Sequence, residues 1–128
     1  MSSLTNSAAC FFAWLVVGMQ ALFGALEMFA PRWVFDRVFD DYFRTRTAPV
    51  WFETEKVARN MGLYNWFLAL GLLLSLVGQL GCTSTSRFFL GCVAVAGAFG
   101  VVSVGPSGAF LAQLSLGLVA FVLFFFRS

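Results

Sequence analysis

Four apolar stretches dominate the pattern of hydrophobic and polar positions along the chain. They cover about residues 9–30, 57–80, 88–104 and 109–126, and the connections between them are richer in polar residues. A helix of about 20 apolar residues spans the roughly 30 Å hydrocarbon layer of a membrane, and each stretch reaches or approaches that length. The pattern therefore predicts an all-α fold: an integral membrane four-helix bundle, formed by a single domain over residues 1–128.

The segment 32–44, between the first two stretches, has a different pattern. Apolar residues recur every three or four positions among charged ones, which is typical of a short amphipathic helix lying in the membrane interface. Its expected buried side consists of Phe35, Phe39 and Tyr42. Its expected solvent side consists of Asp36, Arg37 and Asp40. The alternative is a solvated helix that packs on its own chain.

The remaining connections contain turn-forming and polar residues. We expect irregular chain from Thr45 to Glu55, because Ala48-Pro49 interrupts any regular pattern there. A short polar connection is expected from Gly81 to Arg87. The third stretch then carries small residues on one side of a helix, Gly91, Ala94, Gly97 and Gly100, and such residues allow close helix packing in membranes.

The composition agrees with a membrane protein, since 60% of the residues are hydrophobic and 11% are charged. Six of the 8 basic residues lie between the first two apolar stretches or at the start of the second: Arg32, Arg37, Arg44, Arg46, Lys56 and Arg59. The positive-inside rule places loop 31–56 on the cytoplasmic or matrix side and both termini on the opposite side. A bacterial inner membrane and an organelle membrane both fit. Met1 to Ala9 contains no Lys or Arg, so we expect the first helix to be retained rather than cleaved as a signal peptide.

Histidine is absent from the sequence, which removes His-ligated haem, His-bound zinc and every nucleophile that depends on a His base. The three cysteines, Cys10, Cys82 and Cys92, have no metal-like spacing. We therefore predict no metal and no cofactor. A net charge of +2 gives no reason to expect a nucleic-acid partner.

A few polar residues interrupt the apolar stretches: Gln20, Glu27, Asn60, Tyr64, Asn65 and Gln113. Each unpaired polar group in hydrocarbon costs several kcal/mol, so these residues need partners from other helices. Counting helical turns puts Glu27, Asn60, Tyr64, Asn65 and Gln113 at similar depth, with Gln20 deeper. We expect Glu27 to contact at least one of the second-helix residues, or to be paired with Arg59.

Two motifs resemble a known family. They are Leu26-Glu27-Met28-Phe29 in the first helix and Arg59-Asn60-Met61-Gly62-Leu63-Tyr64-Asn65 in the second, with weaker matches at Gly97-Ala98-Phe99-Gly100 and Gln113. The chain resembles the small four-helix membrane proteins of domain-of-unknown-function family 1304 over nearly its whole length. It departs from the family pattern at four positions: Gln20 in place of His, Met61 in place of Gln, Trp66 in place of Gly, and Leu116 in place of Pro. The resemblance implies an architecture and site residues but no reaction.

Several functions are compatible with these polar residues. We favour a non-enzymatic membrane protein that acts as a structural or interaction subunit or a binding module, with lipids, membrane-protein partners or further copies of itself around it. Its small-residue stripes and phenylalanines would serve partner helices. The alternative is a small membrane enzyme or hydrophobic-ligand-binding protein, with Glu27 as general acid or nucleophile and Tyr64 assisting. A proton or ion path is a further interpretation.

Overall fold

The structure, a computed structural model, describes residues 2–38, 48–78 and 83–127. These residues form only helices, turns and irregular chain. The helices are α1 (Ser2–Phe29), α2 (Pro31–Val38), α4 (Ala48–Leu76), α5 (Thr83–Ser103) and α6 (Gly108–Phe125). The predicted all-α fold is therefore confirmed.

Three of the described helices are long and apolar enough to cross a membrane, over Leu4–Phe29, Thr83–Ser103 and Gly108–Phe125. This supports the prediction of a membrane protein. Helix α4 has 29 residues but is not one of the three. Its sequence up to Asn65 contains charged and amide side chains, such as Arg59 and Asn65, which lower its hydropathy.

The helix bounds differ from the expected ones chiefly at the N-terminal ends. Helix α1 begins at Ser2 instead of residue 9, and α5 begins at Thr83 instead of residue 88. The segment expected to be irregular is helical from Ala48 onwards, because Pro49 lies in the first turn of α4. A first-turn N–H has no intrahelical acceptor, so proline loses nothing there. The apolar stretches therefore predict the apolar part of each helix and miss the polar residues in its first turns.

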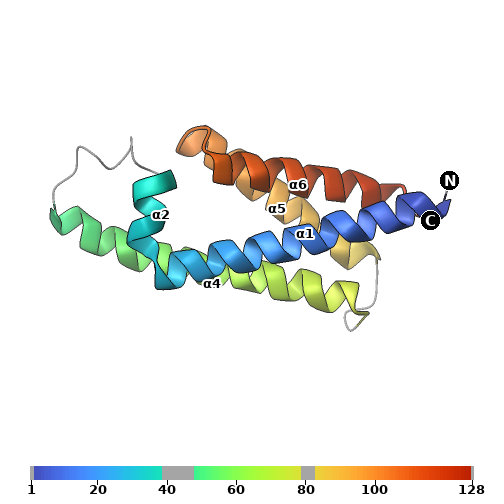
Figure 1. Cartoon of the computed structure of the whole chain (residues 1–128), viewed down its shortest axis with the longest axis horizontal. Helices are drawn as coiled ribbons and strands as arrows, with labels where there is room; N and C mark the ends of the chain where they lie inside the picture. The colour runs from blue at the N-terminus through green and yellow to red at the C-terminus, as the bar shows by residue number, and fades with distance from the viewer. Residues whose placement is uncertain (1, 39–47, 79–82, 128) are drawn as a thin grey trace.

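Two antiparallel helix pairs make up the bundle. Helix α1 packs mainly on α4, and α5 packs mainly on α6. Figure 1 shows the two chain termini at one end of the bundle and the short helix α2 at the other, lying across the direction of the long helices. The two ends of the bundle are therefore built differently.

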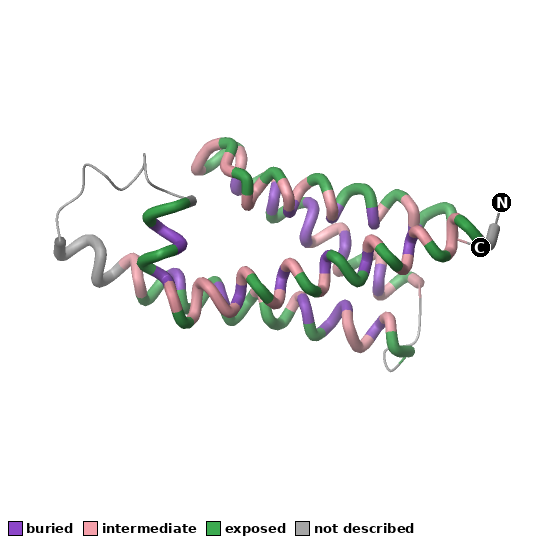
Figure 2. The backbone as a smooth tube through the Cα atoms, viewed as in Figure 1, coloured by how far each residue is buried: buried purple, intermediate pink, exposed green. Residues whose placement is uncertain are grey.

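A tightly packed core fills the end of the bundle that bears the termini. It contains side chains from all four long helices: Ala9, Ala13, Val16, Leu72, Leu90, Val93, Ala120 and Phe124. All eight are buried, and Figure 2 shows buried positions recurring along the long helices between exposed ones. Many of the exposed side chains are large and apolar, for example Phe11, Leu22 and Val119. Such an outer surface suits a lipid environment better than water.

Glycines let both helix pairs approach closely. A Cβ added to Gly24 on α1 would lie 2.7 Å from the carbonyl oxygen of Gly62 on α4, and a Cβ on Gly62 would lie 2.7 Å from the Gly24 carbonyl oxygen. In the second pair, a Cβ on Gly117 of α6 would lie 2.8 Å from the backbone nitrogen of Ala94 on α5. A Cβ on Gly97 would meet the backbone of Leu114. The small residues of α5 thus contact α6 of the same chain.

Helix α2 has one buried and one exposed side. Val34 and Phe35 are buried, whereas Asp36 and Arg37 are exposed. This agrees with the sides predicted for Phe35, Asp36 and Arg37. The other residues of that prediction, Phe39, Asp40 and Tyr42, lie outside the described residues.

Candidate functional site

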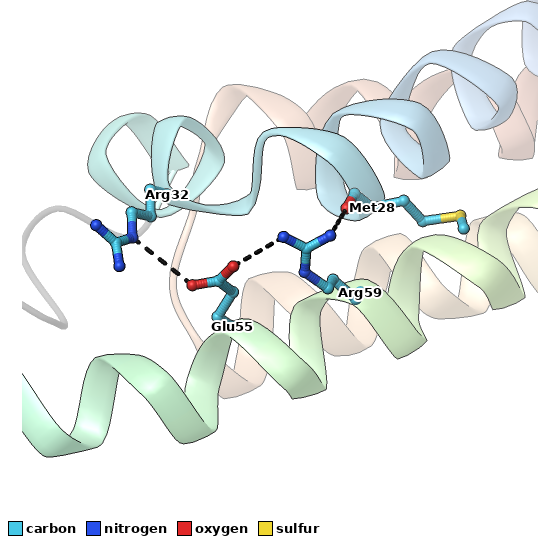
Figure 3. A network of polar contacts seen from close by, with 4 residues as sticks. All are labelled: Met28, Arg32, Glu55 and Arg59. Carbon is cyan, nitrogen blue, oxygen red and sulfur yellow. Dashed lines mark hydrogen bonds and ion pairs between the residues drawn. The ribbon is translucent and has the colours of Figure 1, made fainter.

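A polar network fastens α2 and the end of α1 to α4 (Figure 3). Arg59 donates one hydrogen bond to the Glu55 carboxylate at 2.8 Å and another to the Met28 carbonyl oxygen at 2.7 Å. The Arg32 guanidinium lies 3.6 Å from the other Glu55 oxygen. Met28 is in the last turn of α1, where carbonyls lack helical partners and a cation is favourable. Arg59 therefore binds Glu55 and Met28, and it does not pair with Glu27.

The network also affects the titration of Glu55, which precedes the apolar part of α4. The hydrogen bond from Arg59, helped by the positive charges of Arg59 and Arg32, holds the pKa of Glu55 below its ordinary value. The ionised carboxylate is thus the form that holds α2 to α4.

Glu27 and Asn65 form the central contact of the site. The Asn65 Nδ2 donates a hydrogen bond to Glu27 Oε2 at 2.6 Å, so the expected contact between Glu27 and the second long helix is present. The close approach of Gly24 and Gly62 explains the short distance between α1 and α4, because a Cβ on Gly62 would lie only 3.0 Å from the Glu27 Cβ. Glu27 comes about one turn after Gly24, and Asn65 about one turn after Gly62.

Trp66 also contacts α1, close to Gly24. No contact of this side chain was predicted from the sequence. Its indole Nε1 donates a hydrogen bond to the Ala21 carbonyl oxygen at 3.0 Å, and its ring lies 6.0 Å from that of Phe29. An indole N–H in apolar surroundings needs an acceptor, which is the signal that could have identified this contact.

Gln20 and Gln113 form a second, separate pair. The Gln113 Nε2 donates a hydrogen bond to Gln20 Oε1 at 3.2 Å, and both side chains are buried. Among the described residues, the Gln20 Nε2 has no hydrogen-bond partner. Gln113 was expected level with Glu27 and above Gln20, whereas the structure pairs it with Gln20. Depth counted along each helix takes no account of helix tilt or of the reach of a glutamine side chain.

A cavity of about 880 Å³ lies between the two helix pairs at the α2 end of the bundle. All five described helices line it, mostly with apolar side chains such as Leu26, Val57 and Leu68. Four of the polar residues predicted from the sequence also line it: Glu27, Tyr64, Asn65 and Gln113. Its volume lies within the range of about 300–1,000 Å³ that is usual for ligand pockets.

The other two predicted residues do not line the cavity. Gln20 lies behind Gln113 in the buried interior, and Asn60 is exposed on α4. Tyr64 lines the cavity but is 59% exposed, and its ring packs edge-on against Phe67. No hydrogen bond joins Tyr64 to Glu27 in the described part of the chain. The two candidate catalytic residues therefore share a cavity without activating each other through a direct contact.

Among the described residues, two charged ones line the cavity, Glu27 and Arg37. Arg37 is exposed on α2, where its guanidinium lies 5.7 Å from the centre of the Trp33 ring. Within the described ranges, no group of three or more Cys, Asp and Glu side chains could hold a metal ion. Cys10 and Cys92 are free thiols, and Cys82 lies outside the described residues. The chemistry available to the cavity is therefore hydrogen bonding, charge and apolar contact.

Three apolar helices of membrane-spanning length and a cavity with few polar groups indicate a small helical protein of membrane type. Over residues 14–125, the chain matches the family model described as Protein of unknown function (DUF1304). The chain belongs to this family, as its motifs predicted. No curated protein and no solved structure matches it.

Proposed function

We propose that this protein is a four-span integral membrane protein whose cavity binds a hydrophobic small molecule carrying a polar group. The observation that carries the proposal is the cavity of about 880 Å³, lined by apolar side chains and by Glu27, Asn65 and Gln113. Binding pockets for small molecules combine a mainly apolar wall with a few fixed polar groups. The Asn65 hydrogen bond fixes the Glu27 carboxyl in such a wall.

The arrangement of the helices supports a fourth span formed by α4. Helix α4 packs along α1, which is itself long and apolar enough to cross a membrane. After Asn65 its sequence is almost entirely apolar up to Leu76. Asn65 lines the cavity and hydrogen-bonds Glu27 of α1, so its amide need not meet lipid.

The charge distribution supports one orientation in the membrane. Arg32, Arg37 and Arg59 lie at the α2 end of the bundle, so this end faces the cytoplasm or matrix and the termini face the opposite side. Helix α2 then lies in the interface, with Val34 and Phe35 toward the bundle and Asp36 and Arg37 toward water.

A structural or interaction subunit is the second candidate. Exposed apolar side chains on α5, such as Val95, Phe99 and Val102, would suit a partner helix as well as lipid. However, the small-residue stripe of α5 is occupied by α6 of the same chain. This removes the feature that would best hold a partner helix, so we favour ligand binding.

Diphenylhexatriene, a neutral rod-shaped hydrocarbon, is a suitable first probe for the cavity. Native mass spectrometry of protein released from detergent micelles reads its occupancy from the added mass. We expect one bound probe per chain. The variant Ala109→Trp fills the cavity from the first turn of α6 and should lower the occupancy at least about tenfold.

The matched control is Val119→Trp, which adds the same side chain to an exposed position of α6 outside the cavity. It should bind the probe as the unmodified protein does. An unmodified protein without bound probe, or equal loss of probe from both variants, would contradict the proposal.

A further inference from the structure

We infer that the cavity selects lipophilic amines and other hydrophobic organic cations, which the Glu27 carboxylate binds. This rests on the proposed function, because it names the class of ligand that the cavity would take. Three features support it: the charges that line the cavity, the aromatic rings that line it, and the oxygen atoms there that accept no hydrogen bond from the described residues.

Glu27 has no cationic partner among the described residues. Its hydrogen-bond partner is the neutral amide of Asn65. Arg59, a basic residue of the partner helix α4, binds Glu55 and the Met28 carbonyl instead. Arg32 also forms an ion pair with Glu55. A carboxylate shielded from water favours a cation beside it, and here that position is left for a ligand.

The other lining charge, Arg37, does not cancel this preference. It lies on the exposed side of α2 over the Trp33 ring, and no ion pair joins it to Glu27 within the described part of the chain. A charge in contact with water is screened more strongly than one inside an apolar wall. Of these two charges, that of Glu27 therefore acts more strongly on a ligand in the cavity.

Acceptor atoms remain available at the polar side of the cavity. Asn65 occupies Oε2 of Glu27, while Oε1 accepts no hydrogen bond from the described residues. Gln113 uses its Nε2 to bind Gln20, which leaves its carbonyl oxygen as a further acceptor on a residue that lines the cavity. A primary ammonium group offers only donors, so it matches these two oxygens, and a quaternary ammonium is attracted to the same oxygens by its positive charge alone.

Aromatic side chains make up a large part of the lining: Phe23, Trp33, Phe35, Tyr64, Phe99 and Phe110. The face of an aromatic ring attracts a cation as well as covering an apolar body. Phe23 precedes Glu27 by one turn on α1, so it lies on the same side of that helix. The cavity thus pairs an acid with rings that stabilise positive charge, and it disfavours an anion.

Three probes of one shape test this charge selectivity in the full-length protein. They are diphenylhexatriene, its trimethylammonium derivative and its propionic acid derivative, which are neutral, cationic and anionic. We expect the cationic probe to bind at least about tenfold more tightly than the neutral one, with the anionic probe weakest. This ranking is measured on the unmodified protein, so it does not depend on the folding of any variant.

The substitution Glu27→Gln should bring the affinity for the cationic probe to within about threefold of that for the neutral probe. Asp36→Asn removes the same charge from an exposed position of α2 outside the lining and should preserve the selectivity. Equal or weaker binding of the cation to the unmodified protein would overturn the inference while the proposed function stood, provided that the neutral probe bound. Selectivity that survives Glu27→Gln would also overturn it. Failure of all three probes to bind would overturn the proposed function itself.

Discussion

The two ends of the bundle use the same four helices differently. At the end with the termini, alanines, valines and leucines from all four helices close the interior around Leu72, Leu90 and Phe124. At the α2 end the helix pairs enclose a cavity, and the polar residues Glu27, Asn65 and Gln113 lie on its wall. The comparison shows that one end is closely packed and that the other end contains the cavity in which we propose that a ligand binds.

Truncation of a leucine at each end gives the largest expected difference. Leu90→Ala removes a fully buried side chain from the core and should cost about 2–5 kcal/mol of unfolding free energy. Leu26→Ala removes a side chain that borders the cavity and should cost less than about 1 kcal/mol, because few packing contacts are lost there. Unfolding in bicelles titrated with sodium dodecyl sulfate measures both values. Equal costs would mean that the two ends are packed alike.

Adding one methyl group to α1 tests the crossing that positions Glu27. Gly24→Ala introduces a Cβ that meets the Trp66 ring and the Gly62 carbonyl oxygen, and it should cost about 1–3 kcal/mol. Gly18→Ala lies on the same helix in open space and should be neutral or slightly stabilising. The same unfolding assay compares them. A neutral Gly24→Ala would show that α1 and α4 are not in close contact.

Substitutions at Gln20 and Gln113 test the hydrogen bond between these two buried side chains. Gln113→Met should cost about 1–3 kcal/mol, because Gln20 then keeps a buried amide without a partner. The double variant Gln20→Met with Gln113→Met removes both amides and should return to within about 1 kcal/mol of the unmodified protein. Additive costs in this double-mutant cycle would rule out a direct contact between the two side chains.

The smallest expected effect is the pH dependence of the α2 attachment. Since the pKa of Glu55 is lowered in the folded protein, its ion pairs stabilise α2 above the ordinary glutamate pKa of about 4.3. That contribution is lost as the pH falls through the lowered folded-state pKa. At pH 7, Glu55→Gln should therefore speed hydrogen exchange of the α2 amides relative to the unmodified protein. The difference between the two proteins should vanish at strongly acidic pH, and a persistent difference would assign another role to Glu55.

The sequence predicted those features that depend on the pattern within one helix or on the need of a polar group in hydrocarbon for a partner. The apolar stretches predicted the long helices. Glu27 was predicted to contact at least one of Asn60, Tyr64 and Asn65, and its contact with Asn65 is present at 2.6 Å. The stripe of small residues predicted close packing, which α5 makes with α6.

Features that depend on the relative placement of helices could not be read from the sequence. Gln113 was expected beside Glu27, but it hydrogen-bonds Gln20, because helix tilt and side-chain reach are not encoded in residue spacing. Arg59 was a possible partner of Glu27, but it binds the open carbonyl of Met28 and the Glu55 carboxylate. The cavity depends on five helices at once, so no local pattern could have indicated its volume.

Photolabelling tests most directly whether the α2 end is a binding site. The probe is an alkylamine that carries a diazirine in its chain, and mass spectrometry of the digested protein locates the attached label. We predict labels on cavity residues such as Phe23, Leu68 and Phe110, with loss of labelling when excess unlabelled alkylamine is added. Labels confined to outward-facing residues such as Phe11 and Val119, or labelling that the competitor does not reduce, would contradict the account.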